Sequence, residues 1–416
     1  MEANVLRPTD YYRLPWSLTD NVLAWLEPTK RCNLYCEGCY SRNDPKSDKP
    51  LEQVRAEIAS FLAQRKVDSL SIAGGDPLVY PHIVEVVRMI RHDFGVKPII
   101  NTNGLALTDE LLAELRDAGL FGFTFHIDSS QGRPGWKKKN ELELNALREH
   151  YAKRVHAAGD LSVSFNMTVF PETLHYVPEL LDWAASNIDI VHGMVFILFR
   201  TMRSAEFDYF AQGDPVEGDN LGDLVYYDQD KNPEPLKAQD VVDVIRAADP
   251  SYSPAAYLGG TKDPNSFKWL LAGRLGAQGR IHGYVGPRYM EMIQTAHHAV
   301  TGKWLGYVQP SMLSHGRSML AGFAPFDTGV RKIAANWAKD TARAPWRAAE
   351  KLHFQSVLII QPIDMMPDGE MNMCDGCPDM TVKDGQLLWS CRLDEYTQHG
   401  CFLTASPRKA PIPEAK

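Results

Sequence analysis

Short apolar runs alternate with amphipathic stretches from about residue 22 to residue 200, and this alternation constrains the fold more than any other feature of the sequence. Six such runs separated by helix-like segments are typical of repeated strand–helix units, which build a parallel sheet buried on both faces. Six units are too few for a closed eight-stranded barrel. We therefore predict an α/β fold, a partial (β/α)6 TIM-like barrel. The strand-like runs are 22–26, 69–73, 97–101, 122–128, 162–170 and 190–199.

The segment 108–118 shows the helical pattern most clearly. Thr108 can accept a hydrogen bond from a first-turn amide, and Asp109 and Glu110 suit the positive end of the helix dipole. Gly119 is placed to end the helix. The other helix-like segments of this region are 51–62, 81–92, 141–157 and 176–185.

The pattern changes after residue 200. Residues 205–350 combine glycine-rich turns with helix-like stretches at 238–247, 289–300 and 330–342, and they predict a mostly helical insertion that forms a substrate-binding or lid region. Residues 351–405 begin with a strand-like run at 357–360 and continue into a cysteine-rich segment, which predicts a small C-terminal metal-cluster domain. Residues 1–20 form an extension before the barrel at 21–204, and residues 406–416 form a frayed tail.

The charge balance argues against two classes of partner. Lys and Arg number 44 against 52 Asp and Glu, which gives a net charge of −8. Bulk attraction to nucleic acid or to an anionic membrane is therefore not expected. No apolar run approaches the ~20 residues of a transmembrane segment, and the first residues lack the apolar core of a secretory signal. These features predict a cytoplasmic protein, in which thiols stay reduced.

Seven cysteines fall into two groups, one near each end of the chain. Cys32, Cys36 and Cys39 follow the first strand-like run with the spacing C-x3-C-x2-C. Three thiolates on one loop can hold three irons of a [4Fe–4S] cluster and leave the fourth iron free to bind another molecule. The alternatives are a zinc site that lacks its fourth ligand and buried cysteines without a metal.

This loop resembles the signature of the radical S-adenosylmethionine (radical SAM) superfamily, and the resemblance covers roughly residues 20 to 200. Gly74-Gly75-Asp76-Pro77 is similar to the family's GGEP motif, with Asp in place of Glu. The segments 101–104, 126–129 and 166–168 resemble the family's later strand-end motifs. All of these motifs follow or end predicted strands, the edge at which ligands of such sheets bind.

The resemblance implies that Cys32, Cys36 and Cys39 hold a [4Fe–4S] cluster. It also implies that the open iron binds S-adenosylmethionine (SAM), and that an external donor of the flavodoxin or ferredoxin type supplies an electron. Cleavage of SAM would then give a 5′-deoxyadenosyl radical that abstracts hydrogen from a substrate or adds to it. The residues expected at SAM are Gly74, Gly75, Asp76, Pro77, Asn101, Asn103, Asp128, Ser129 and Asn166.

The second group consists of Cys374, Cys377, Cys391 and Cys401. The dipeptide Asp384-Gly385 predicts a hairpin whose second strand leads to Cys391. Four thiolates can hold either a second [4Fe–4S] cluster or a zinc ion, and His399 could replace Cys401. The arrangement partly resembles the auxiliary-cluster extensions called SPASM or twitch domains, which favours the cluster.

Several charged side chains near the motifs allow two interpretations. Arg133 and Arg200 each follow a predicted strand, where they could bind a carboxylate or phosphate, but we expect surface arginines. His126 is either a hydrogen-bonded core histidine or a catalytic group. We expect the run 137–139, which is Lys-Lys-Lys, to be solvated.

Three functions remain open at this point. The resemblance favours a radical SAM enzyme acting on a small-molecule or lipid-like, isoprenoid-like substrate, and an auxiliary cluster would also suit a peptide-modifying maturase. A non-catalytic two-cluster electron carrier or sensor is the third, although a carrier would supply a fourth cysteine in the first loop. Seven aromatic residues could line an apolar pocket, but we expect them to form the core of the helical region: Trp269, Tyr284, Tyr289, Trp304, Tyr307, Phe323 and Phe326.

Overall fold

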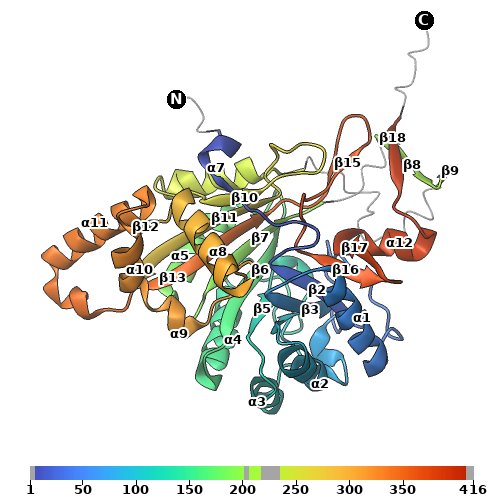
Figure 1. Cartoon of the computed structure of the whole chain (residues 1–416), viewed down its shortest axis with the longest axis horizontal. Coiled ribbons are helices and arrows are strands. Elements are labelled where there is room, and N and C mark those ends of the chain that lie inside the picture. The colour runs from blue at the N-terminus through green and yellow to red at the C-terminus, as the bar shows by residue number, and fades with distance from the viewer. Residues whose placement is uncertain (1–4, 201–205, 217–234, 409–416) are drawn as a thin grey trace, which may run out of the picture.

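A computed structural model describes residues 5–200, 206–216 and 235–408 of the chain (Figure 1). Its centre is a run of six parallel strands that pair with one another in chain order. They are β2 (Leu23–Thr29), β3 (Ser69–Gly74), β4 (Lys97–Thr102), β5 (Gly122–His126), β6 (Ser162–Val169) and β7 (Gly193–Leu198). The predicted partial barrel is thus confirmed.

Helices connect these strands and cover their outer side (Figure 1). They are α1 (Leu51–Gln64), α2 (Ile83–Arg88), which continues as a π-helical turn at Met89–Asp93, α3 (Asp109–Asp117), α4 (Asn145–Ala158) and α5 (Val177–Ser186). The hydroxyl of Thr108 accepts a hydrogen bond from the amide of Leu111 at 3.1 Å, as the sequence predicts. Leu112 and Leu115 of α3 are buried, so this helix is fixed by its apolar face.

The sheet continues past β7 with strands from distant parts of the chain. The additional strands are β13 (His353–Ile360), β11 (Trp269–Ala277), β12 (Arg280–Tyr284), β10 (Ala256–Leu258) and β1 (Tyr12–Arg13). β13 lies parallel to β7, and β11 lies antiparallel to β13. The segment predicted as mostly helical, and the one predicted as a C-terminal domain, therefore both contribute strands to the main sheet.

The helices of residues 235–350 pack around these added strands. They are α7 (Ala238–Ala248), α8 (Pro287–Thr301), α9 (Pro310–Leu313), α10 (Gly316–Phe323) and α11 (Thr328–Arg343). α10 and α11 lie at one end of the molecule, far from the C-terminal hairpin (Figure 1). Trp269, Tyr284 and Tyr289 are buried in the apolar cores, whereas Phe326 is 59% exposed. These three are core residues, but only Tyr289 lies on a helix, because Trp269 and Tyr284 lie on β11 and β12 of the main sheet.

The cysteine-rich C-terminal segment folds into small sheets and one short helix. Its elements are β14 (Asp364–Met365), β15 (Met371–Asn372), β16 (Met380–Lys383), β17 (Gln386–Trp389) and α12 (Leu393–His399). Asp384 and Gly385 both have positive φ angles, 51° and 75°, in the turn between β16 and β17. A two-residue hairpin turn needs left-handed residues at both central positions, and this turn has them. The predicted hairpin is therefore confirmed.

A third small sheet joins the end of the described chain to its middle. Strands β8 (Phe207–Ala211), β9 (Asp214–Pro215) and β18 (Thr404–Pro407) form it. β18 extends two residues into the segment predicted as a tail, and residues 409–416 lie outside the described residues. Over the described ranges, no helix combines the length and the apolar character needed to cross a bilayer.

A buried ion pair beside β5 gives a test of the fold. Arg148 of α4 donates to Glu141 at 2.6 Å and to the carbonyl of Ile127 at 2.7 Å, and both charged side chains are at most 1% exposed. Replacement Arg148→Met leaves a buried carboxylate without its cation, so we expect a loss of about 3–5 kcal/mol of unfolding free energy in urea titrations. The exposed pair of Arg116 with Asp117 is the control, and Arg116→Met should cost less than about 1 kcal/mol. Equal effects of the two substitutions would contradict this account.

Candidate functional site

The loop after β2 places three thiols at the carboxyl edge of the sheet. Cys32, Cys36 and Cys39 are half-buried, and each lies close enough to another to affect its titration. Burial, together with the neighbouring Cys39, Asp128 and Cys32, raises the pKa of Cys36. Burial likewise raises the pKa of Cys39 to about 11. The three groups would become thiolates only beside a compensating positive charge such as iron.

Hydrogen bonds hold the first cysteine of the loop in place. The amide of Cys32 donates to the Asn43 side chain at 3.0 Å, and the Asn43 amide group donates back to the Cys32 carbonyl at 3.0 Å. The amide of Leu34 lies 3.4 Å from the Cys32 sulfur. Such amide-to-sulfur contacts are among the features that tune an iron–sulfur cluster.

The motif at residues 74–77 fastens this loop to the sheet. The amide of Gly75 donates to the carbonyl of Thr29 at 2.9 Å, and that of Asp76 donates to the carbonyl of Arg31 at 2.8 Å. A Cβ on Gly74 would lie 2.2 Å from the Thr29 oxygen, and one on Gly75 would lie 2.1 Å from the Arg31 oxygen. Only glycine permits both approaches.

The carboxylate of Asp76 joins the ends of β3 and β4. It accepts hydrogen bonds from the Thr102 hydroxyl at 2.8 Å and from the Asn103 amide at 2.8 Å, and it caps the short turn at Leu78 at 3.0 Å. The residue is 1% exposed, and burial raises the pKa of its carboxyl group. Because these protein donors occupy the Asp76 carboxylate, the side chain holds the ends of β3 and β4 together.

The three asparagines that the sequence predicts at SAM differ in the hydrogen bonds of their side chains. Asn103 donates to Asn33 at 2.7 Å and lies 3.8 Å from the Cys32 sulfur, beside the cysteine loop. The Asn101 amide nitrogen and the Asn166 amide oxygen are buried and have no hydrogen-bond partner among the described residues. Buried polar groups are normally paired, so these two atoms mark places where a polar ligand can bind.

Asp128 is the best-anchored acid of the site. Its carboxylate accepts from His126 at 2.7 Å, from the Ser130 hydroxyl at 2.6 Å and from the Thr168 amide at 3.2 Å. His126 is therefore hydrogen-bonded, as one of the two interpretations proposed. The amide of Ser129 donates to Glu141 at 2.7 Å, which fixes the turn after β5.

The expectation that Arg133 and Arg200 lie on the surface is wrong. Arg133 is 2% exposed and Arg200 is 7% exposed. Arg133 donates to the carbonyl of His126 at 3.2 Å, and its charge acts on Cys36, Asp76 and Asp128. Its Nη1 atom is buried and has no hydrogen-bond partner among the described residues. The sequence does show that Arg133 follows a predicted strand, and this position was the signal that it could belong to the site.

The second cysteine group is brought together in part. Cys374 and Cys377 are buried and interact with each other, and both lie near Cys391. The contact with Cys377 lowers the pKa of Cys374 against the effect of burial, and the charge of Lys268 lowers it further. Cys401 is half-buried just beyond α12. The buried Nε2 of His399 has no partner among residues 5–200, 206–216 and 235–408.

A second buried cation lies beside this group. Arg65 is 1% exposed and donates to the carbonyl of Cys377 at 2.5 Å. Arg65 and Lys268 therefore both favour thiolates at the second group. Within the described part of the chain, no three His, Cys, Asp or Glu side chains are placed to hold a single metal ion.

The pKa of Asp128 provides a test of the hydrogen bonds that hold its carboxylate. Burial alone would raise its pKa, but the charge of His126 and the hydrogen bonds from His126, Ser130 and Thr168 outweigh burial and lower the pKa to about 2. A lowered folded-state pKa means that the ionised group stabilises the fold above about pH 4 and loses this effect as pH falls toward 2. We expect Asp128→Asn to cost about 2 kcal/mol of unfolding free energy at pH 7, and we expect the cost to shrink below pH 4.

Denaturant unfolding between pH 2 and pH 7 measures this difference. Asp117→Asn, which removes an exposed carboxylate, is the control and should show little dependence on pH. A cost for Asp128→Asn that stays constant down to pH 2 would contradict the assignment.

Part of the chain is similar to known proteins. Residues 26–184 match the family model of the radical SAM superfamily. The AdoMet-dependent heme synthase of Methanosarcina barkeri is 27% identical over 205 residues, which cover 46% of this chain and 55% of that protein. The GTP 3',8-cyclase of Chlorobaculum tepidum is 34% identical over 103 residues, which cover 24% of this chain and 31% of that protein.

The chain matches about half or less of the length of these relatives. Among solved structures, Streptococcus suis SuiB bound to S-adenosylmethionine gives a TM-score of 0.36 at 15% identity, covering 46% of this chain and 43% of that one. The family match spans five of the six central strands, from within β2 to β6, together with the cysteine loop and the motifs at the strand ends. Residues 26–184 are therefore a radical SAM domain.

Proposed function

We propose that Cys32, Cys36 and Cys39 hold a [4Fe–4S] cluster and that the chain binds SAM at its open iron to carry out radical chemistry on an organic substrate. The observation that carries the proposal is the three-thiol loop after β2 of a sheet whose strands β4 and β6 carry two buried asparagine atoms without partners among the described residues. A reduced cluster with SAM bound supplies homolysis of the sulfonium–C5′ bond, which gives methionine and a 5′-deoxyadenosyl radical.

The donor set of the site suits SAM. The carboxylate of SAM needs a cationic donor. The guanidinium of Arg133 can be this donor, because its buried Nη1 atom is unpaired among the described residues and its charge acts on Cys36. The Asn166 oxygen can accept from a hydroxyl or amino group, and the Asn101 nitrogen can donate to an oxygen or ring nitrogen. Asn101 lies near the end of β4, Asn166 lies in β6 opposite the last residue of β5, and Arg133 lies in the loop after β5.

The chain also provides an apolar wall beside the cluster loop. The rings of Phe170 and Phe199 are stacked with centroids 4.6 Å apart. A Cβ on Gly38, between Cys36 and Cys39, would lie 2.9 Å from the Phe199 ring. Such close packing keeps water and unwanted hydrogen donors away from a reactive radical.

The second cysteine group is proposed to hold an auxiliary [4Fe–4S] cluster through Cys374, Cys377, Cys391 and Cys401, with zinc as the alternative. Three of the four thiols are near one another, and the buried cations Arg65 and Lys268 favour their ionised form. An external donor of the flavodoxin or ferredoxin type would reduce the enzyme.

Removal of the guanidinium tests the proposed SAM contact. Arg133→Met removes the cation without adding a polar group, so we expect SAM to bind at least about tenfold more weakly. Equilibrium dialysis of the reconstituted protein measures the affinity. Cluster absorption is the internal control and should be unchanged. An unaltered SAM affinity would show that Arg133 is structural only.

Metal analysis tests both cysteine groups. In the triple substitution of Cys32, Cys36 and Cys39 by Ala, we expect no 5′-deoxyadenosine from SAM with dithionite, and we expect about four irons per chain to remain at the second group. Tyr35→Phe, at an 81% exposed residue of the same loop, is the control and should keep cleavage. Stoichiometric zinc in place of the remaining iron would refute the auxiliary cluster, and undiminished 5′-deoxyadenosine would refute the role of the first loop.

A further inference from the structure

The cysteine loop ends at Tyr40, whose hydroxyl binds the last residue of β3. The amide of Gly74 donates to the Tyr40 hydroxyl at 2.8 Å, and the hydroxyl donates to the carbonyl of Gly74 at 3.1 Å. One side-chain atom therefore pairs with both backbone groups of a single buried residue. Tyr40 directly follows Cys39, so this contact joins the third cysteine to the strand end.

The backbone at Gly74 needs such contacts to keep one conformation. The ladder between β3 and β4 pairs residues 69–72 with residues 97–100 and ends before Gly74. Gly74 has a φ angle of 104° and is followed by a second glycine. Because glycine has little intrinsic preference among backbone conformations, contacts with neighbouring groups have to fix this turn. The Tyr40 hydroxyl supplies two of these contacts.

A tryptophan of β2 orients the hydroxyl. The indole nitrogen of Trp25 donates to the Tyr40 hydroxyl at 3.2 Å and to Glu27 at 3.1 Å, and the rings of Trp25 and Tyr40 meet edge to face with centroids 5.6 Å apart. A phenolic hydroxyl has one proton to donate and can accept two hydrogen bonds. The bonds with Gly74 and Trp25 use this whole capacity, so they define one orientation of the hydroxyl.

Three consecutive residues at the end of β3, residues 74–76, hold both ends of the cysteine loop. The amides of the second and third of these residues donate to carbonyls that precede the first cysteine, and Gly74 binds Tyr40 after the third cysteine. All three cysteines lie between these two attachments. Hydrogen bonds depend on distance and angle, so the attachments fix where the thiols lie relative to the strand end.

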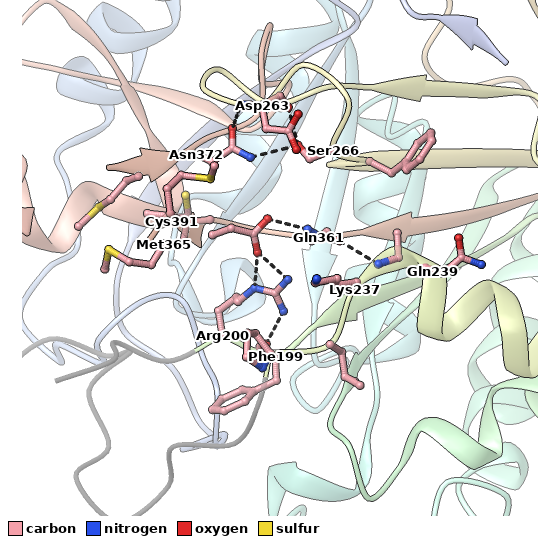
Figure 2. A pocket seen from close by; sticks show the side chains of 18 of the residues that line it. Phe199, Arg200, Lys237, Gln239, Asp263, Ser266, Gln361, Met365, Asn372 and Cys391 are labelled. Carbon is pink, nitrogen blue, oxygen red and sulfur yellow. Dashed lines mark hydrogen bonds and ion pairs between the residues drawn. The ribbon is translucent and has the colours of Figure 1, made fainter. Parts of the chain in front are cut away.

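The middle of the loop rests on an aromatic ring. A Cβ on Gly38 would lie 2.9 Å from the ring of Phe199, so the ring packs directly against the loop. Phe199 also forms part of the wall of a cavity of about 600 Å³ (Figure 2). Apolar packing is non-directional, so this contact limits the approach of the loop without setting its orientation. The orientation depends on the hydrogen bonds at the two ends.

We propose that Tyr40 is a positioning residue for SAM: its hydroxyl keeps the turn at residues 74–77 in place relative to the cluster held by the cysteine loop. The inference rests on the proposed function, because it requires SAM to bind both the open iron and this turn. A ligand that contacts two parts of a protein binds more weakly when their relative position varies, because binding must then order them. Iron binding itself should be kept, because all three thiols remain on the loop.

The substitution Tyr40→Phe tests this role, because it removes the hydroxyl and keeps the ring. Tyr284→Phe is the matched control, since the hydroxyl of this buried residue of β12 donates to Asp249 at 2.8 Å. In the reconstituted holoproteins we expect equal iron contents. We expect SAM to bind at least about fivefold more weakly after Tyr40→Phe and with unchanged affinity after Tyr284→Phe.

The affinity is the SAM concentration that gives half of the change in the electron paramagnetic resonance signal of the reduced cluster. A merely structural role would lower the resistance of both variants to urea and leave both affinities at the wild-type value, which would overturn the proposal. Loss of the cluster from Tyr40→Phe would overturn it as well, because the hydroxyl would then serve cluster assembly.

Hydrogen exchange at the Gly74 amide tests the contact without SAM. Loss of its acceptor should speed exchange of this amide at least about tenfold in Tyr40→Phe and leave it unchanged in Tyr284→Phe. Equal exchange in the wild type and Tyr40→Phe would overturn the proposal. A wild-type cluster whose signal does not respond to SAM would refute the proposed function and this role with it, whereas a normal wild-type response with an unaltered Tyr40→Phe affinity would refute this role alone.

Discussion

The close contact between the end of β3 and the start of the cysteine loop is the constraint on which the site depends. Two backbone hydrogen bonds, from Gly75 to Thr29 and from Asp76 to Arg31, hold the loop against the sheet. Any side chain at residue 74 or 75 would collide with the oxygens that accept these bonds. The Asp76 carboxylate extends the same contact to β4 through Thr102 and Asn103. The positions of the three thiols relative to the strand ends therefore follow from a few short-range backbone contacts.

This arrangement leaves several buried polar atoms without a hydrogen-bond partner among the described residues. Asn101, Asn166 and Arg133 each keep one unpaired buried atom at the carboxyl edge of the sheet. Unpaired buried donors and acceptors destabilise a fold, and a polar ligand that binds them would offset this cost.

The sequence predicts the part of the fold that local patterns encode. β2 to β7 and α1 to α5 were all identified because each has a regular period and recognisable ends. β11 was missed because it contains Gly273, where a Cβ would lie 2.3 Å from Phe354, and a glycine required by packing looks like a turn residue in sequence. The cysteines were singled out from their spacing, and the strand-end asparagines from the resemblance of their segments to radical SAM motifs. Arg200 was misjudged because its partner Asp364 is 164 residues away and no local pattern reports such a pair.

The direct test of the central claim is electron–nuclear double resonance of the reduced holoprotein with SAM labelled by ¹⁵N in its amino group. A cluster held by Cys32, Cys36 and Cys39 alone leaves one iron for that nitrogen, so a clear hyperfine coupling to ¹⁵N is predicted, together with its loss when Cys36 is replaced by Ala. A reduced cubane cluster whose signal shows no coupling to the labelled nitrogen, with SAM present in excess, would contradict the account.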